Sequence, residues 1–446
     1  MARYMADDDD YMMDDEEMAD YDDIGYDYQN QGRGDADSDS EDDYEAITRP
    51  VDTSAADARR GRDIQGIPWE RLNFTRQKYR ETRLEQYKNY ENIPQSRDEL
   101  EKVCKHPEKG GKFYDFFYNT RSVKSTIVHF QLRNLVWATS KHDVYVLSNY
   151  SISHWSPLFR KETVFVNVAG PIVPSEQSHP GSLRSGLSQV QISTMAVKDN
   201  LLVAGGFQGE LICKYLDRPH VSYCSRITYD DNAITNAVEI YHSASGATQF
   251  MTSSNDCGVR VFDVERFALM KHFSFPWAVN HTSVSPDKKL LVVVGDDAEG
   301  FLSDCQTGKP VASLRGHMDY SFASAWHPDG QIFATGNQDM TCRLWDVRNL
   351  STSFAILKGH LGAIRSIRFS SDGQFMSMAE PADFVHVYDA KHDYNKCQEI
   401  DFFGEIAGIS FSPDTESLFI GVADRTYGSL LEYRRQHEYS YLDSLI

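Results

Sequence analysis

A turn that recurs about every 42 residues is the sequence feature that most constrains the fold. In four segments an apolar run leads into a Pro/Ser-Asp turn and then a second apolar run, as two antiparallel strands joined by a tight turn require. The turn aspartates are separated by 42, 43 and 42 residues: Asp287, Asp329, Asp372 and Asp414. This period is typical of a four-stranded β-propeller blade. The sequence therefore predicts an all-β ring.

Three more copies of the pattern, around Asn134, Asp199 and Ser245, bring the predicted number of blades to seven. After the last repeat only three strands remain, so the ring needs a fourth strand from elsewhere. We predict that residues 112–119 (KFYDFFYN) supply it, because closure removes unpaired strand edges. The propeller then spans residues 112–435, and residues 436–446 form a C-terminal tail.

The segment before the propeller divides into two parts of opposite character. Residues 1–45 hold nineteen acidic residues against two arginines, which predicts a disordered acidic tail over residues 1–47. The net charge of −21 is therefore mostly a property of this tail, and nucleic acid is an unlikely partner because the tail repels phosphate. Ser38 and Ser40 each stand three residues before an acidic residue, a spacing that suits an acid-directed serine kinase or merely reflects a solubilising serine.

Residues 48–111 are interpreted as a basic and helical extension with a linker. Basic residues cluster at Arg59–Arg62, and residues 75–90 lack Gly and Pro while Tyr79, Leu84, Tyr87 and Tyr90 recur at near-helical spacing. Two interpretations stay open. The segment is a docking element or a nuclear-import patch, or its helix lies against the side of the propeller.

Cysteine usage and motif content indicate a soluble, non-catalytic protein of the cell interior. The seven cysteines form no CxxC pair, which fits reduced thiols, and no apolar stretch predicts a membrane segment. No phosphate loop, HExxH or GxSxG motif occurs. We therefore predict no catalytic, cofactor-binding or metal-binding residues, and we interpret the cluster of Asp230, Asp231 and Asn232 as a solvated turn.

The fifth repeat reads GHMDYSFASAWHPDGQIFATGNQDMTCRLWDVR, and it resembles the WD40 family through its Gly-His start and Trp-Asp finish. That resemblance implies a buried hydrogen-bond chain with a structural rather than catalytic role. Other repeats keep the pattern only in part. The third has Phe262 for Trp, and the sixth keeps His360 but has Met378 and Tyr388, so we expect apolar packing to hold these blades. The residues of the implied chain are His317, Thr335, Asp339 and Trp345.

The same repeat is similar in a second way to another class of propeller. Asp346 and Arg348 complete a WDxR motif like that of cullin-RING ubiquitin ligase substrate receptors, whose guanidinium would bind an adaptor carboxylate. The alternative is that the two residues only bracket an internal turn. Segments such as DARRGRDIQGIPWERL and LLVAGGFQGELICK also resemble a plant family of WD40 proteins with fungal relatives, and this likeness extends over nearly the whole chain. Some members meet a nuclear export receptor, which implies nucleus and cytoplasm.

The predicted function is a monomeric, non-catalytic scaffold that binds other proteins, with a ligase substrate receptor as the alternative. Loops leading into each blade should gather on one face, which we expect to bind partners. Trp277 is either an exposed anchor on this face or packed under its loop. The expected partner face consists of Asp230, Asp231, Trp277, Tyr320, Arg365 and Glu405.

Overall fold

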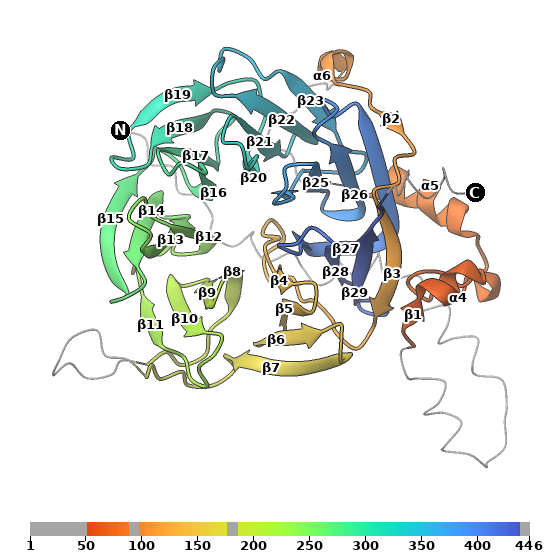
Figure 1. Cartoon of the computed structure of the whole chain (residues 1–446), viewed down its shortest axis with the longest axis horizontal. Coiled ribbons are helices and arrows are strands. Elements are labelled where there is room, and N and C mark those ends of the chain that lie inside the picture. Colours follow the sequence, from red (N-terminus) through yellow and green to blue (C-terminus); the bar gives the residue numbers. More distant parts are fainter. Residues whose placement is uncertain (1–50, 89–97, 176–185, 438–446) are drawn as a thin grey trace, which may run out of the picture.

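The computed structural model describes residues 51–88, 98–175 and 186–437. The predicted acidic tail with Ser38 and Ser40, and residues 438–446, lie outside the described residues. Within them, antiparallel sheets are arranged as a ring around a central axis (Figure 1). Five sheets have four strands each, and one sheet has nine.

Each four-stranded sheet is one blade, and its strands follow the chain order. Blade one contains β4 (Val136–Ser140), β5 (Asp143–Ser148), β6 (Ser151–Ser156) and β7 (Lys161–Asn167). Blade two contains β8 (Ile192–Lys198), β9 (Leu201–Gly206), β10 (Glu210–Tyr215) and β11 (Tyr223–Arg226). Blade three contains β12 (Thr235–His242), β13 (Thr248–Ser254), β14 (Gly258–Asp263) and β15 (Ala268–Ser274). Blade four contains β16 (Val279–Val284), β17 (Leu290–Gly295), β18 (Gly300–Asp304) and β19 (Pro310–Leu314). Blade five contains β20 (Ser321–Trp326), β21 (Ile332–Asn337), β22 (Thr341–Asp346) and β23 (Ala355–Lys358).

The nine-stranded sheet holds two blades joined by one long strand. The first half of β27 pairs with β26, and its second half pairs with β28. Blade six is therefore β24, β25, β26 and the start of β27, and blade seven is the end of β27 with β28, β29 and β3. Together with the five separate sheets, this arrangement is consistent with the seven repeats of the sequence. The bounds are β24 (Ser366–Phe369), β25 (Phe375–Ala379), β26 (Ala382–Asp389), β27 (Lys396–Phe411), β28 (Ser417–Ala423), β29 (Ser429–Arg435) and β3 (Tyr114–Thr120).

Blade seven joins the two ends of the propeller. Strand β3 pairs antiparallel with β29, with Thr120 opposite Leu430 and Tyr114 opposite Arg435. Two short strands extend these sheets further: β1 (Thr53–Ser54) pairs with β3, and β2 (Glu108–Lys109) runs parallel to β27. The edges of blades six and seven are thus covered by segments that precede the ring in the chain, which removes exposed strand edges.

The repeated turn aspartates close the hairpin between the first two strands of their blades. Each accepts a hydrogen bond from the backbone N–H two residues on, as Asp329 does from Gln331 at 2.8 Å and Asp372 from Gln374 at 3.0 Å. The residue directly after each aspartate has a positive φ, and two of these are Gly330 and Gly373, at 74° and 67°. Because an Asp side chain can cap such a turn and glycine adopts positive φ without strain, the turn fixes the register of the hairpin.

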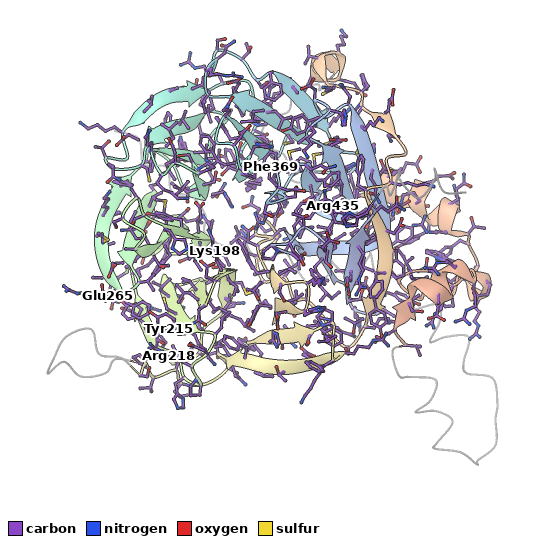
Figure 2. The ribbon with its side chains drawn as sticks, in the orientation of Figure 1. Lys198, Tyr215, Arg218, Glu265, Phe369 and Arg435 are labelled. Carbon is purple, nitrogen blue, oxygen red and sulfur yellow. The ribbon has the colours of Figure 1, made fainter. Side chains whose placement is uncertain are left out.

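Apolar clusters fill the spaces between neighbouring blades. The cluster between blades five and six, for example, contains Leu344, Ile364 and Met376, each buried completely. Close approach of the blades requires small residues at some positions. A Cβ on Gly336 would lie 2.7 Å from the Ile364 carbonyl oxygen of the next blade. Figure 2 shows side chains throughout the ring, with Lys198 and Phe369 nearer its centre than Tyr215 and Glu265.

The described part of the extension before the ring contains four short helices, and its first part lies at the side of the ring near β3 (Figure 1). None of the helices in the described ranges is long and apolar enough to cross a membrane. The helices are α4 (Ala55–Arg59), the 3-10 helix η1 (Trp69–Arg71), α5 (Arg76–Gln86) and α6 (Asp98–Val103).

Candidate interaction surfaces

Blade five carries a buried chain of hydrogen bonds. His317 Nδ1 lies 3.0 Å from Asp339 Oδ2, and His317 Nε2 lies 2.9 Å from Thr335 Oγ1. Trp345 Nε1 donates to the same hydroxyl at 2.9 Å. All four side chains are at most 8% exposed. Since the Thr335 hydroxyl accepts a hydrogen bond from the indole, it can donate its own hydrogen to the imidazole. Each of the four side chains in this hydrogen-bond network then has a partner.

The carboxylate of Asp339 anchors this chain. Burial raises its pKa, but the charge and hydrogen bond of His317, together with donors from Thr341 and the Met318 backbone, outweigh burial and lower the pKa overall. Thr341 Oγ1 donates to Asp339 Oδ1 at 2.6 Å, and the Met318 N–H donates to Oδ2 at 3.1 Å. The Thr335 hydroxyl is buried and bonded to both the imidazole and the indole, so the four side chains tie loops together as a structural network.

Trp277 is not exposed on the loop face, which is the face formed by the loops that lead into the blades. Its side chain is 9% exposed and stacks on Phe301, with ring centroids 5.5 Å apart and an interplanar angle of 14°. Phe275 stacks beside it at 6.1 Å. The expectation of an exposed tryptophan anchor is therefore wrong, because the loop folds the indole onto aromatic side chains of its own region, and the packed alternative holds.

Arg365 and Glu405 also differ from the expected exposed partner residues. Arg365 is only 3% exposed, and burial lowers the pKa of its guanidinium to about 9. Glu405 accepts hydrogen bonds from Arg133 at 2.9 Å and from the Tyr87 hydroxyl at 3.3 Å. Both residues lie under or beside the chain's own extension. Tyr320 is half-buried, so Asp230 and Asp231 are the members of the predicted face that are exposed.

The helix α5 holds the extension on blades six and seven through arginines. Arg83 donates from Nε and Nη2 to the two oxygens of Asp383, at 2.9 and 3.0 Å, and Arg80 Nη1 reaches Asp383 Oδ2 at 2.6 Å. Arg76 and Arg80 both pair with Asp401. Asp383 is completely buried, so its charge depends on this pairing. Of the two interpretations of the segment, the structure shows the helix packed on the propeller.

Aromatic and amide contacts strengthen the same junction. The Arg80 guanidinium lies 4.1 Å from the ring centroid of Phe403, and Trp69 and Tyr79 pack on that ring. The Gln65 side chain bonds the Phe403 backbone twice, accepting from its N–H at 2.7 Å and donating to its carbonyl at 2.5 Å. The extension therefore occupies the loop face of blades six and seven as a bound peptide would.

Within the described residues, the loop face of blades one and two is left uncovered by the extension. A pocket of about 260 Å³ lies there, lined by the loop before β8, by Gln208 and Glu210, and by Arg226 and Tyr229. The Tyr229 side chain is 83% exposed, and Asp230 and Asp231 follow it. The Arg226 guanidinium lies 3.8 Å from Glu210. This corner combines an exposed aromatic ring, carboxylates and a polar hollow, which are the features of a peptide-binding surface.

The WDxR motif lies at the end of β22, on the face opposite His317. Arg348 bonds Asp346 twice, from Nε to Oδ1 at 2.9 Å and from Nη2 to Oδ2 at 2.5 Å. The arginine side chain is 70% exposed. The pair thus brackets a turn, as one interpretation expected, while the guanidinium stays accessible from solvent.

Apolar clusters fill blade six, as the sequence predicts, but the blade also contains a buried polar network that the sequence does not predict. Glu380 is completely buried and accepts hydrogen bonds from the backbone N–H groups of His360 (2.8 Å), Leu361 (2.5 Å) and Gly362 (3.0 Å). Its Oε1 also lies 2.7 Å from His386 Nε2. Blade three likewise contains a buried Asp256–Arg260 pair with two hydrogen bonds. Polar networks therefore persist where the repeat pattern is lost.

Comparison with known proteins agrees with this architecture. The model of the WD domain, G-beta repeat family matches residues 308–346 and 351–380, which hold blade five and part of blade six. These two segments therefore resemble WD40 repeats. A chain of a structure titled Crystal Structure of Mitotic Checkpoint Complex superposes with a TM-score of 0.57 at 12% identity, over 71% of this chain and 94% of that chain. At that identity the match shows the propeller fold alone.

Curated relatives match different shares of the chain. An uncharacterized protein of Schizosaccharomyces pombe is 25% identical over 322 residues, 67% of this chain and 86% of that protein. The serine-threonine kinase receptor-associated protein of Gallus gallus is 35% identical over 81 residues, 18% of this chain and 23% of the relative. Pre-mRNA-processing factor 19 homolog 2 of Arabidopsis thaliana is 25% identical over 50% of this chain and 42% of the relative. WD40 proteins act as protein-interaction scaffolds, and that is the class of function that these matches support.

Sequence reasoning missed two groups of residues in this protein. The sequence predicts the helix α5 but not the partners of its arginines, because Asp383 and Asp401 lie 300 or more residues later. Glu380 and His386 stand outside the repeat signature. The one available signal was the conflict between a retained Gly-His start and the lost Thr and Trp in blade six.

Proposed function

We propose that this protein is a non-catalytic scaffold that binds other proteins through the open loop face of blades one to three, in both nucleus and cytoplasm. The observation that carries the proposal is the contrast within one face. Blades six and seven are covered by the chain's own extension, whereas Tyr229, Asp230 and Asp231 are exposed beside a polar pocket. A rigid ring with one open corner suits a partner that contributes a short segment.

The chemistry of this corner favours a basic segment as the bound element. Asp230 and Asp231 lie at its rim and the carboxylate of Glu210 lines the pocket, whereas Arg226 is the cation among the lining residues. An exposed tyrosine offers a ring on which an arginine or lysine of the partner can stack. Arg226 itself lies 6.0 Å from the Tyr229 ring centroid, which shows that a guanidinium fits this side.

The proposal is tested by quantitative affinity capture from cells with two matched variants. Tyr229→Ala combined with Asp231→Asn should remove the partners captured by the wild-type chain. Met270→Ala, at an exposed position of β15, serves as the control because its side chain is 52% exposed and far along the chain from this corner. Equal capture by the wild-type chain and the double variant, with unchanged melting temperatures, would refute the proposal.

The alternative function is a substrate receptor of a cullin-RING ubiquitin ligase. The observation that favours it is the exposure of the Arg348 guanidinium on the face opposite the tetrad. If this function holds, Arg348→Ala should remove the ligase adaptor from the captured proteins while the ring stays folded. Unchanged adaptor recovery would exclude this function. A nuclear export receptor among the captured proteins would support the proposed shuttling between nucleus and cytoplasm.

A further inference from the structure

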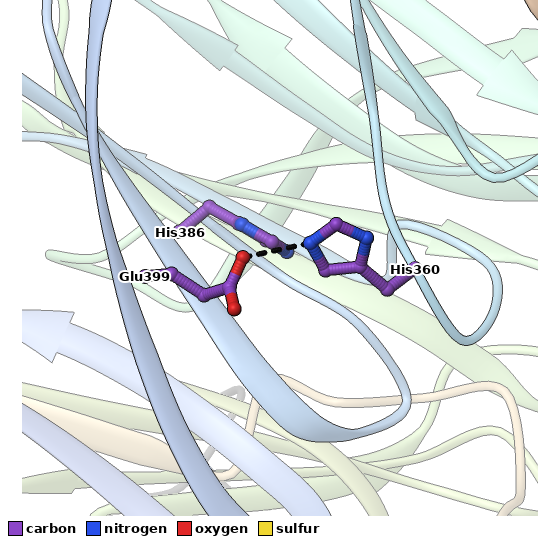
Figure 3. A group of neighbouring side chains, drawn as sticks. All are labelled: His360, His386 and Glu399. Atoms are coloured by element: carbon purple, nitrogen blue, oxygen red, sulfur yellow. Dashed lines mark hydrogen bonds and ion pairs between the residues drawn. The ribbon is translucent and has the colours of Figure 1, made fainter. Parts of the chain in front are cut away.

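Three side chains of blade six converge on one point at its rim. His360 comes from the loop between β23 and β24, His386 from β26 and Glu399 from the neighbouring position of β27. Their ligand atoms all lie within 4.8 Å of one another. Figure 3 shows the Glu399 carboxylate facing His360, with the His386 ring beside them. We propose that these residues form a binding site for a divalent metal ion, and that Zn²⁺ is the ion that suits them.

The donor set fits zinc chemistry. Two imidazoles and one carboxylate form a ligand set that Zn²⁺ accepts, with a water molecule in the fourth position. Ligand atoms in a tetrahedral zinc site lie about 2.0–2.2 Å from the metal and therefore somewhat over 3 Å from one another. His360 Nε2 and Glu399 Oε2 are now 2.7 Å apart, so a small rotation of the partly exposed His360 ring makes room for an ion.

The surroundings of His386 resemble those of a metal ligand. Its Nε2 is 2.7 Å from Glu380 Oε1, and Glu380 is fixed in turn by three backbone N–H groups. A carboxylate behind an imidazole is the arrangement that orients metal-binding histidines and raises their basicity. With Nε2 donating to Glu380, Nδ1 of His386 keeps a lone pair for the cation. The ring is only 3% exposed and cannot turn away freely.

A positive group already lies at this point. Lys109 Nζ is 3.2 Å from Glu399 Oε2 and 3.3 Å from His360 Nε2. The ammonium thus contacts two of the three proposed ligands, as a cation between them would. Its side chain is 67% exposed, so it can move into solvent when an ion binds. Lys109 comes from β2 in the extension, so the bound metal and the extension meet at the same edge of blade six.

The site goes beyond the proposed scaffold function, and its test does not depend on a protein partner. The full chain is titrated with Zn²⁺ by calorimetry and with Co²⁺ by visible absorption. We expect one ion per chain, and a melting temperature that rises with zinc because the ion binds only the folded state. His360→Ala and Glu399→Gln should each weaken binding at least tenfold. Lys109→Ala should tighten binding severalfold, because it removes the competing ammonium.

His392→Ala is the matched control, since His392 lies in the same blade with its side chain 71% exposed and bonded to Asp389. It should bind zinc as the wild-type chain does. Equal binding by the wild-type chain and His360→Ala would overturn the site, and so would weaker binding by Lys109→Ala. The lysine variant keeps the test informative if a ligand substitution fails to fold, because it leaves all three ligands in place.

Discussion

Blades five and six solve the same structural problem with different side chains. In blade five, Asp339 accepts from His317, and Thr335 links that histidine to Trp345. In blade six the histidine is kept as His360, but the buried carboxylate is Glu380, which binds three backbone N–H groups and His386 instead. The difference shows that a propeller blade needs a buried acceptor for its loop N–H groups, and that the residues of the familiar motif are one way to supply it.

The two blades also differ in what covers them. The loop turn of blade six is capped by α5 of the extension, whose Arg83 pairs with Asp383. Met340 occupies the equivalent position of blade five, and both Met340 and Asp383 have a positive φ of 69°. An acidic residue in this left-handed position gives the extension its anchor on blade six.

The strongest test of the comparison is removal of the blade six acceptor. Glu380→Ala would leave several buried donors without a partner, so we expect a loss of about 3–5 kcal/mol in the free energy of unfolding. Chemical denaturation measures this loss. The control is Glu299→Ala, which removes one side of an exposed ion pair and should lower the free energy of unfolding by less than about 0.5 kcal/mol. A loss from Glu380→Ala as small as that of the control would mean that apolar packing alone holds blade six.

A second variant tests the hydrogen-bond chain of blade five. Thr335→Val keeps the shape but removes the acceptor of the Trp345 N–H and the partner of His317, which should cost about 2 kcal/mol. Trp345→Phe should lower the free energy of unfolding less in this variant than in the wild-type chain, because Thr335→Val has already removed the partner of the indole N–H. Strict additivity in this double-mutant cycle would argue against a connected chain.

The charge of Asp339 predicts a third difference, in acid stability. The pKa of Asp339 is lowered in the folded state despite burial. Its ionised carboxylate therefore contributes to the free energy of unfolding above the unfolded-state pKa of about 3.8, and this contribution is lost as pH falls through the folded-state pKa. Asp339→Asn should lower the free energy of unfolding by about 1 kcal/mol at pH 7. Below pH 4 the stability of this variant should fall less steeply with pH than that of the wild type. Melting curves from pH 7 to 3 measure both. A variant whose curve declines in parallel with the wild type would contradict this role of Asp339.

The smallest expected effect is on the opposite face of blade five. Arg348→Ala removes an exposed ion pair with Asp346, so the free energy of unfolding should change by less than about 0.5 kcal/mol. A loss above about 1 kcal/mol would show that the motif stabilises the blade more than an exposed pair can. The variant is therefore suitable for testing adaptor binding without loss of the fold.

The fold was readable from the sequence where local chemistry determines it. The turn aspartates at Asp329 and Asp372 cap N–H groups two residues away, so the hairpins follow from short-range signals. Trp277 was ambiguous because its exposure depends on Phe301, which belongs to another strand of the blade. The anchor of α5 was out of reach, since a helix rich in arginine does not reveal which distant carboxylates it meets.

The proposed partner face was predicted only in part for the same reason. Loop positions follow from the repeat, which places Asp230, Arg365 and Glu405 at the entrances of their blades. Whether such a residue is open depends on what lies over it. Glu405 contacts Tyr87 from the extension, whereas Asp230 is exposed.

Site-specific photocrosslinking tests the central claim, an interaction scaffold with one open corner, most directly. A photoreactive phenylalanine analogue is placed at position 229, 270 or 348 of the full chain in cells, and adducts are identified by mass spectrometry. The account predicts protein adducts at position 229 and none at position 270. Absence of adducts at 229, with adducts at 348, would contradict it and would favour the ligase receptor instead.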